Sequence, residues 1–245
     1  MKVATFNISH CQDFSITTAD DAPVNIEKYA KYIDEMDADV LVLNEVYFKG
    51  VEDCFNEQVK KLNVYEKYPY TAEGVGKDLG WATIGNAILS KYPIEKVECL
   101  SVLAPDEAER RVGENEWYED RVVVCVTLNV KGKQVRVMGT HFGLNVLEKE
   151  RMLQVLCPKI DDADMPVILM GDFNARPHTD ILMPLYKRLV SCADVLKNTD
   201  YTFSSFEPYC AIDYIFASKN IEVKGFEVKK DILSDHRACC AILEL

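Results

Sequence analysis

The sequence predicts an α/β (α+β) fold in which two mixed β-sheets pack face to face and helices lie outside, a four-layer α-β-β-α sandwich. Three observations lead to this prediction. Apolar strand patterns flank an amphipathic helix near the start, alternating strand patterns follow without intervening helices, and a helix followed by an apolar strand recurs in the second half. Mixed sheets with helices in both halves of the chain suit two packed sheets with outer helices.

The first half opens with a β-α-β pattern. Residues 2–8 alternate like a strand, residues 24–36 place apolar side chains at helical spacing, and residues 39–45 form a nearly continuous apolar run typical of a buried strand. Residues 53–62 predict a second helix. The strands expected next, the last two joined by a hairpin turn at Lys131-Gly132, cover residues 82–89, 95–102, 122–130 and 134–140.

The second half combines the same kinds of element. Helices are predicted over residues 147–159 and 179–189, and an apolar strand is predicted over residues 166–170. The closing strands are expected over residues 213–217, 223–229 and 238–244. No internal repeat, low-complexity tract or linker rich in Pro, Gly or Ser divides the chain, so we expect residues 1–245 to form one domain.

Composition and charge narrow the classes of partner. With 48% apolar residues and no run of eighteen of them, the chain should build an ordinary core and should not span a membrane. The net charge of −12 disfavours a broad surface for duplex nucleic acid, because phosphate neutralisation dominates that affinity. A small anionic substrate stays compatible with this charge. We also expect the chain to act as a monomer.

Cysteine usage and the first residues indicate a compartment. The nine cysteines form no regular framework and include no CxxC pair, so we expect reduced thiols and no structural zinc site. The opening sequence MKVATFNIS lacks the long apolar stretch and cleavage site of a secretory signal. Both observations predict a cytoplasmic protein.

Polar residues stand where apolar strands stop, and loops at such ends can present side chains from a rigid scaffold. Each one alone has an ordinary explanation as a turn, a cap or a solvated strand end. Their joint order and type favour a site. The positions are Asn7, Glu45, His141, Asp172, Asn174 and Asp213, followed later in the chain by Asp235-His236.

Seven short sequences occur in the order found in the endonuclease/exonuclease/phosphatase superfamily, and the chain resembles that superfamily from residue 6 to residue 236. The sequences are FN at 6–7, NE at 44–45, GNAILSKYPI at 85–94, GTH at 139–141, GDFN at 171–174, IDYIF at 212–216 and SDH at 234–236. A lone GDFN or SDH would be weak, but seven in order at domain-wide spacing are specific. The resemblance implies a metal-dependent phosphoesterase on the sandwich fold.

The resemblance implies a site for Mg²⁺ or Mn²⁺. Glu45 would be the principal ligand with Asn7 beside it, since hard cations choose carboxylate and amide oxygens. Asp235 resembles the family carboxylate that approaches the metal, either as a second ligand or through water. One-metal and two-metal mechanisms both stay open.

The resemblance also implies catalytic roles. His236 would lie beside the scissile phosphate as base, acid or electrostatic clamp, with Asp213 fixing its tautomer. Asp172 would orient or deprotonate the attacking water, while Asn174 and His141 would donate hydrogen bonds to phosphate oxygens.

Three further basic residues lie close in sequence to the expected strand ends. Arg121 opens a strand where related enzymes place an arginine near the active face, which predicts a phosphate contact; an ordinary strand-end charge is the alternative. His10 and His178 also follow site residues and either could line the mouth of the pocket, but we expect both in surface loops, outside the site.

The expected function is hydrolysis of a small or lipid-derived phosphoester by a phosphodiesterase or phosphatase, with water attacking phosphorus. The alternatives are an endonuclease or exonuclease on DNA or RNA, and a catalytically dead binding module. Some nuclease branches carry an acidic residue where this chain has Ser9, so one possible metal ligand is absent. Residues 208–214 lack the Trp-Cys-Asp-Arg cluster of inositol polyphosphate phosphatases, which disfavours that substrate specificity. Substrate choice is expected to lie in residues 74–81, 105–120 and 204–210.

Overall fold

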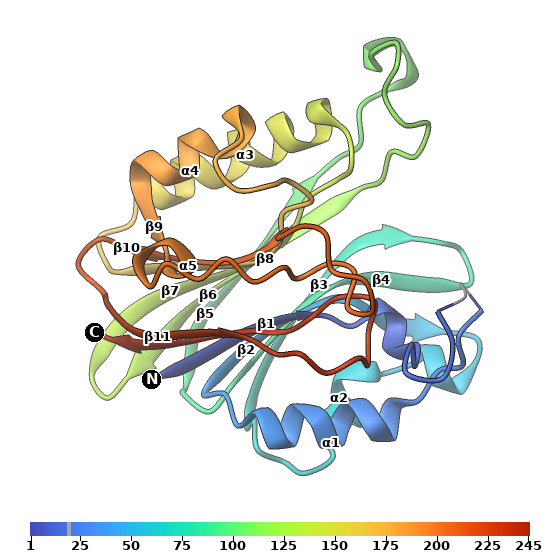
Figure 1. Cartoon of the computed structure of the whole chain (residues 1–245), viewed down its shortest axis with the longest axis horizontal. Coiled ribbons are helices and arrows are strands. Elements are labelled where there is room, and N and C mark those ends of the chain that lie inside the picture. Colours follow the sequence, from blue (N-terminus) through green and yellow to red (C-terminus); the bar gives the residue numbers. More distant parts are fainter. Residues whose placement is uncertain (19–20) are drawn as a thin grey trace.

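The computed structural model describes residues 1–18 and 21–245, and it confirms two mixed sheets packed face to face with helices outside (Figure 1). The first sheet has the order β11 (Glu222–Val228), β12 (Cys239–Glu244), β1 (Lys2–Asn7), β2 (Val40–Gly50), β4 (Ala82–Ser90) and β3 (Tyr70–Asp78). The second has the order β5 (Ile94–Val102), β6 (Arg121–Val130), β7 (Lys133–His141), β8 (Val167–Asp172), β10 (Asp213–Ser218) and β9 (Leu189–Ser191).

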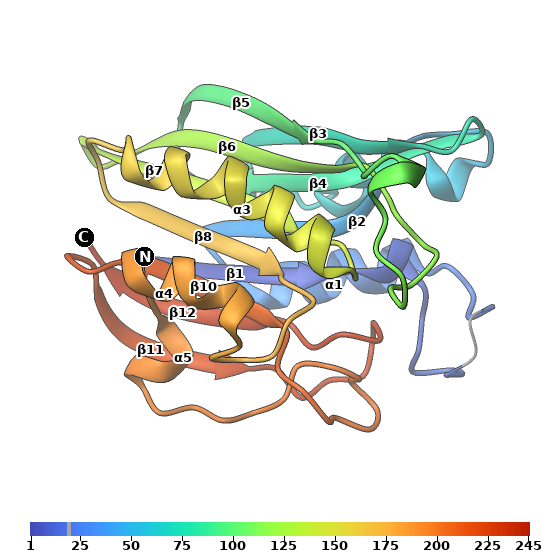
Figure 2. The same ribbon diagram turned by 90° about the horizontal axis from the view of Figure 1, so that it is seen from above.

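The helices form the two outer layers. Those that cover the first sheet are α1 (Ile26–Met36) and α2 (Gln58–Leu62), and those that cover the second are α3 (Val146–Asp161) and α4 (Met183–Arg188) (Figures 1 and 2). The remaining helical pieces are α5 (Cys192–Val195) and the 3-10 turns η1 (Ser9–Cys11), η2 (Asp53–Phe55), η3 (Glu107–Glu109) and η4 (Asp180–Leu182).

Strand β2 shows why the central strands read as unbroken apolar runs. Because side chains alternate across a strand, Val40 and Val42 enter the core between the sheets, while Leu41 and Leu43 enter the core under α1. All four are fully buried. A strand covered on both faces therefore needs apolar residues at every position.

Helix α1 begins and ends where its sequence dictates. The side chain of Asn25 accepts a hydrogen bond from the backbone N–H of Lys28 and caps the first turn. Tyr29 and Ile33 pack into the core on one face. The helix ends at Met36, and the capping residue Asp37 takes a left-handed conformation with φ +48°.

Strand register brings the predicted polar residues to one edge of the sandwich. In the first sheet, β1 runs parallel to β2, with Asn7 opposite Asn44. In the second, β7 runs parallel to β8 and antiparallel β10 lies on its other side, so Asp172 is opposite both His141 and Asp213. Three consecutive strands of that sheet thus each supply one polar side chain at the same level.

Some expected elements differ in the structure. The helix expected over residues 53–62 is divided into η2 and α2, because Glu57 takes a left-handed φ of +48° and its N–H bonds to the Phe48 carbonyl. The helix expected over residues 179–189 is η4 followed by α4, and its last residue already belongs to β9. The sequence pattern does not predict strand β3.

Two further observations concern the whole described chain. Within residues 1–18 and 21–245, no helix combines the length and hydrophobicity that a bilayer crossing requires. All nine cysteines carry free thiols. The cytoplasmic location expected from the thiols stays a prediction.

Candidate active site

A cavity of about 710 Å³ opens at the edge where the polar strand ends meet. Of the nine predicted site residues, seven line it: Glu45, Arg121, His141, Asp172, Asn174, Asp235 and His236. The other two, Asn7 and Asp213, are buried directly behind the wall and hydrogen-bond to lining residues. The structure therefore brings all nine side chains into one constellation drawn from both sheets.

His236 and Asp213 form a buried pair. The Nδ1 atom of His236 lies 2.9 Å from Oδ2 of Asp213, and the ring packs against Phe203 with centroids 4.8 Å apart. Burial alone would lower the pKa of His236, but the Asp213 and Asp172 carboxylates raise that pKa well above its ordinary value. This shift favours the imidazolium form of the ring, and its Nε2 atom is the nitrogen that lies beside Asp172.

Asp172 lies at the centre of the constellation. Its Oδ2 accepts a hydrogen bond from Asn7 Nδ2 at 3.2 Å and lies 3.5 Å from His141 Nε2 and 3.6 Å from His236 Nε2. Burial raises the pKa of Asp172 to about 7, although the neighbouring imidazolium opposes the rise. A carboxylate with a pKa near neutrality can accept a proton during turnover.

The glycine before Asp172 is required by close packing of the strands. Gly171 has φ +148°, and a Cβ built on it would lie 1.8 Å from the Thr140 carbonyl oxygen. A side chain at this position would push β8 away from β7. Gly171 therefore keeps Asp172 level with His141.

The sequence pattern predicts a strand that ends at Glu45, but in the structure β2 continues to Gly50. The register shifts between Asn44 and Val46, so Glu45 is an extra residue in a β-bulge with a left-handed φ of +59°. The bulge carries the Glu45 carboxylate to the cavity, where Oε1 accepts from Asn7 Nδ2 at 3.0 Å. A bulge re-aims a side chain without ending the strand.

Asn7 bridges two carboxylates. Its Nδ2 donates to Glu45 and to Asp172, while its Oδ1 accepts from the Ser9 backbone N–H at 3.1 Å. The amide oxygen is thus engaged by the backbone. In this arrangement the Asn7 side chain orients both carboxylates, and its role as an oxygen ligand of the cation stays a prediction.

His10 lines the cavity, so the expectation that it lies in a surface loop outside the site was wrong. Its Nδ1 lies 3.2 Å from the Glu45 carbonyl oxygen and its Nε2 lies 3.3 Å from Glu45 Oε2, and the ring packs on Tyr47. Residues 9–11 all have positive φ values, which turn the chain back over Glu45. By contrast His178 is largely exposed beside Tyr186, as expected.

Asp235 supplies a further carboxylate to the cavity. Its Oδ1 accepts from the Ser234 hydroxyl at 3.0 Å. Burial raises the pKa of Asp235, and the negative charge of Glu45 adds to the rise. Two carboxylates that repel each other at a cavity wall fit a bound cation, which would relieve the repulsion.

Another group, Asp172, Asp213 and His236, has potential ligand atoms that lie within 4.8 Å of one another. Here, however, the positive charge already comes from the His236 imidazolium, which is hydrogen-bonded to Asp213. The assignment of Glu45 and Asp235 as the cation ligands stays a prediction.

His141 is held from both sides of its ring. Arg121 Nη1 lies 3.2 Å from Nδ1, and Asn174 Nδ2 lies 3.3 Å from Nε2 and donates to the Phe142 carbonyl oxygen at 3.0 Å. Burial, and then the charge of Arg121, lower the pKa of His141 well below its ordinary value. The ring is therefore neutral.

The sequence did not identify Asn44 as a residue that joins the two sheets. Its Nδ2 donates to Asn86 Oδ1 at 2.7 Å and to the Thr140 carbonyl at 2.9 Å, and its Oδ1 accepts from the Asp172 backbone N–H. Asn44 is fully buried. The signal was present, since an asparagine inside a buried apolar strand needs partners.

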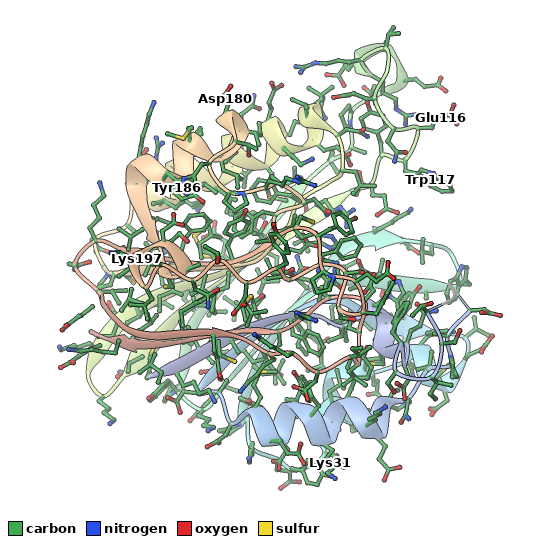
Figure 3. The ribbon with its side chains drawn as sticks, viewed as in Figure 1. Lys31, Glu116, Trp117, Asp180, Tyr186 and Lys197 are labelled. Atoms are coloured by element: carbon green, nitrogen blue, oxygen red, sulfur yellow. The ribbon has the colours of Figure 1, made fainter. Side chains whose placement is uncertain are left out.

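The three segments expected to decide substrate choice all reach the rim of the cavity. They contribute Gly76, Lys77, Leu79, Trp117, Glu119, Asp120, Tyr209 and Cys210. Trp117 is 71% exposed and projects, with Glu116 beside it, from the loop between β5 and β6 (Figure 3). Gly76 and Lys77 lie on β3 and the other rim residues lie in loops, while strands and the loops beside them supply the polar floor.

Comparison with known proteins gives distant relatives. The uncharacterised protein YbhP of Escherichia coli K12 is 28% identical over 148 residues, covering 56% of this chain and 54% of YbhP. Sphingomyelinase C 2 of Leptospira interrogans is 26% identical over 209 residues, covering 69% of this chain and 32% of the relative. The chain thus spans about half of the first relative and a third of the second.

A solved structure of similar fold is the mannosyl-6-phosphatase of Bacteroides thetaiotaomicron. It is 18% identical, with a TM-score of 0.75 and complete coverage of both chains. The model of the endonuclease/exonuclease/phosphatase family matches residues 4–236. Because that match spans nearly the whole chain, the protein belongs to the endonuclease/exonuclease/phosphatase family.

Proposed function

We propose that this protein is a divalent-metal-dependent phosphodiesterase or phosphatase that hydrolyses a small or lipid-derived phosphoester by attack of water on phosphorus. The same proposal describes a single-domain, monomeric and cytoplasmic enzyme. The observation that carries the proposal is the position of Asp172 between the Nε2 atoms of His141 and His236. A base between two nitrogen donors suits a water nucleophile beside a phosphate. Relatives named sphingomyelinase and mannosyl-6-phosphatase support a phosphoester substrate.

Glu45 and Asp235 would hold Mg²⁺ or Mn²⁺. Both are carboxylates, the ligand type that hard cations prefer, and both face the cavity. Asn7 and His10 fix the Glu45 carboxylate from opposite oxygens. When bound, the cation would stabilise negative charge on the phosphate.

Asp172 would orient the attacking water and accept its proton. The Asn174 backbone N–H donates to Asp172 Oδ1 and Asn7 donates to Oδ2, so both oxygens are held in place. Its pKa near 7 suits proton transfer at neutral pH.

Hydrogen-bond donors surround the place where the phosphate would lie. His236, held by Asp213 and protonated, would act as an acid or an electrostatic clamp through Nε2. His141 and Asn174 would donate to phosphate oxygens from the opposite side of Asp172. Such donors lower the barrier because they are already oriented before charge develops.

The charges at the cavity favour a small substrate over a long nucleic acid. Lys77 and Arg121 share the single carboxylate of Glu119, at 2.6 and 3.0 Å, so these three side chains together leave one positive charge at the cavity. The net charge of −12 adds no attraction for a polyphosphate chain. One phosphate group, and not a row of them, fits this distribution.

A substrate panel tests the proposal. Phosphodiesters, phosphomonoesters and oligonucleotides would be assayed with Mg²⁺, with Mn²⁺ and with a chelator, using Asp172→Asn as the inactive control. We expect metal-dependent hydrolysis of a small ester that the control lacks. Preferred cleavage of oligonucleotides, with strongly salt-dependent affinity, would identify a nuclease. Absence of turnover on the whole panel would favour the binding module.

A further inference from the structure

A second hydrogen-bonded chain of side chains, Glu119, Arg121 and His141, lines the cavity, with His141 on the other side of Asp172 from the Asp213–His236 pair. We propose that Arg121, anchored by Glu119, is a positioning residue that fixes His141 in the tautomer carrying its proton on Nε2. This inference rests on the proposed phosphoester chemistry, since it assigns His141 as a donor to the reacting phosphate. It differs from the sequence-based expectation that Arg121 itself contacts phosphate.

The tautomer follows from what a guanidinium can do. Arginine has only N–H donors and stays charged, so it cannot accept a proton from an imidazole. Arg121 Nη1 lies 3.2 Å from His141 Nδ1. The Nδ1 atom must therefore accept, and a neutral ring then carries its proton on Nε2.

A competing donor lies at the other end of the ring. Asn174 Nδ2 is 3.3 Å from His141 Nε2, and a hydrogen bond from that amide would require Nε2 to accept. A neutral imidazole offers one acceptor only, so Arg121 and Asn174 compete for it. The charged donor forms the stronger hydrogen bond, and Asp172 Oδ2 at 3.5 Å from Nε2 favours a proton there.

Glu119 keeps the guanidinium in place. Its Oε2 lies 3.0 Å from Arg121 Nη2, its Oε1 lies 2.6 Å from Lys77 Nζ, and its backbone N–H donates to Glu148. Only 18% of the Arg121 side chain is exposed. Two of its terminal nitrogens are thus engaged by Glu119 and His141, which limits their contact with a substrate.

Because His141 is buried, the position of its ring proton decides whether Nε2 can donate a hydrogen bond to a phosphate oxygen. Burial and the nearby charge of Arg121 lower the pKa of His141 and keep the ring neutral, so only one of its two nitrogens carries a proton. With the proton on Nε2, His141 presents an N–H beside Asp172, where the phosphate would lie. With the proton on Nδ1, the same ring would present a lone pair and repel a phosphate oxygen.

Nitrogen-15 NMR of the histidine side chains, recorded on the metal-free full chain, tests the tautomer directly. The chain has four histidines, and comparison with His141→Gln identifies the His141 signals. We expect the Nε2–H tautomer in the wild type. In Arg121→Met, Asn174 remains as a donor facing the ring and the proton should move to Nδ1. Arg121→Lys, which retains a cationic donor, should restore Nε2–H at least in part.

Kinetics on an ester from the substrate panel separate positioning from phosphate contact. Arg121→Met should lower kcat by about 10- to 100-fold, the usual loss when an orienting partner is removed, with KM nearly unchanged. A raised KM with unchanged kcat and tautomer would instead identify a phosphate contact and overturn the proposal. An Nδ1–H tautomer in the wild type would overturn it without any variant. The NMR result stands even if no ester is hydrolysed, so it is independent of the proposed function.

Discussion

The Nδ1 atom of His236 lies 2.9 Å from Oδ2 of Asp213, and this contact turns the opposite ring nitrogen toward Asp172. The pair is assembled across the sheets, because Asp213 begins β10 beside β8 whereas His236 precedes β12. Asp213 also meets Asp172 in strand register. Removing either member should therefore disturb the same catalytic function.

We predict that His236→Ala lowers kcat/KM by ~10²–10⁴-fold, the usual cost of losing a positioned acid–base group. Asp213→Asn should leave the imidazole in place but mis-set its proton. The double variant should be little worse than His236→Ala, because both changes remove one function. Steady-state kinetics of all four proteins measures this, with the exposed His178→Ala as a control that keeps full activity. Fully multiplicative losses would show that the residues act independently.

Glu45→Gln should weaken Mg²⁺ and Mn²⁺ binding more than any other single change, because it removes the bulge carboxylate while keeping its shape. Isothermal titration calorimetry with each metal measures the affinity. Glu207→Gln, at an exposed carboxylate outside the cavity lining, is the matched control and should bind metal like the wild type. Unchanged affinity and turnover in Glu45→Gln would refute the assigned role.

Asn44→Ala should lower the free energy of unfolding by roughly 1–3 kcal/mol, since it leaves buried partners of the Asn44 amide unsatisfied. It should also reduce kcat, because the Asp172 backbone N–H loses its acceptor. Urea unfolding measures the first effect, with the exposed turn residue changed in Asn220→Ala as control. Wild-type stability in Asn44→Ala would show that the two sheets are joined by other contacts.

The raised pKa of His236 predicts a pH-dependent stability of the metal-free protein. Burial opposes the shift, but Asp213 and Asp172 raise the pKa above the ordinary 6.5. Such a group stabilises the fold fully below its unfolded pKa, and the contribution is lost as pH rises through the folded value. The stability advantage of wild type over Asp213→Asn should thus be largest near pH 6 and shrink above pH 6.5, by at most about 1.4 kcal/mol per pH unit.

Urea unfolding in chelator between about pH 5 and 9 measures this advantage. Asp172, whose pKa is raised to about 7 chiefly by burial, changes wild-type stability in the same direction between pH 4 and 7. A difference between the two proteins that grows with pH would contradict the assigned imidazolium.

The sequence predicted the sandwich because its strands are buried on both faces. Runs such as residues 40–43 are apolar at every position, which is a strong signal. Strand β3 lacked that signal, since its inward positions are Ala72 and Gly74. A Cβ at Gly74 would lie 2.6 Å from the Val124 side chain, so close packing requires a small residue and removes the hydrophobic pattern.

The candidate site was predictable where strand ends carry polar residues, as at Asp172 and His141. It was not predictable where the backbone turns unexpectedly. His10 reaches the cavity through three consecutive non-glycine residues of positive φ, a conformation that no side chain in residues 9–11 announces. Glu45 was identified, but the bulge that aims it depends on pairing with β4, a long-range contact.

The fate of solvent oxygen tests the proposed water attack on phosphorus most directly. The best ester of the panel would be hydrolysed in ¹⁸O-labelled water with Mg²⁺ or Mn²⁺, and both products analysed by mass spectrometry. We predict one solvent oxygen in the phosphate product and none in the alcohol, with both products lost in Asp172→Asn. Label in the alcohol, or unchanged turnover in Asp172→Asn, would contradict water attack on phosphorus at this site.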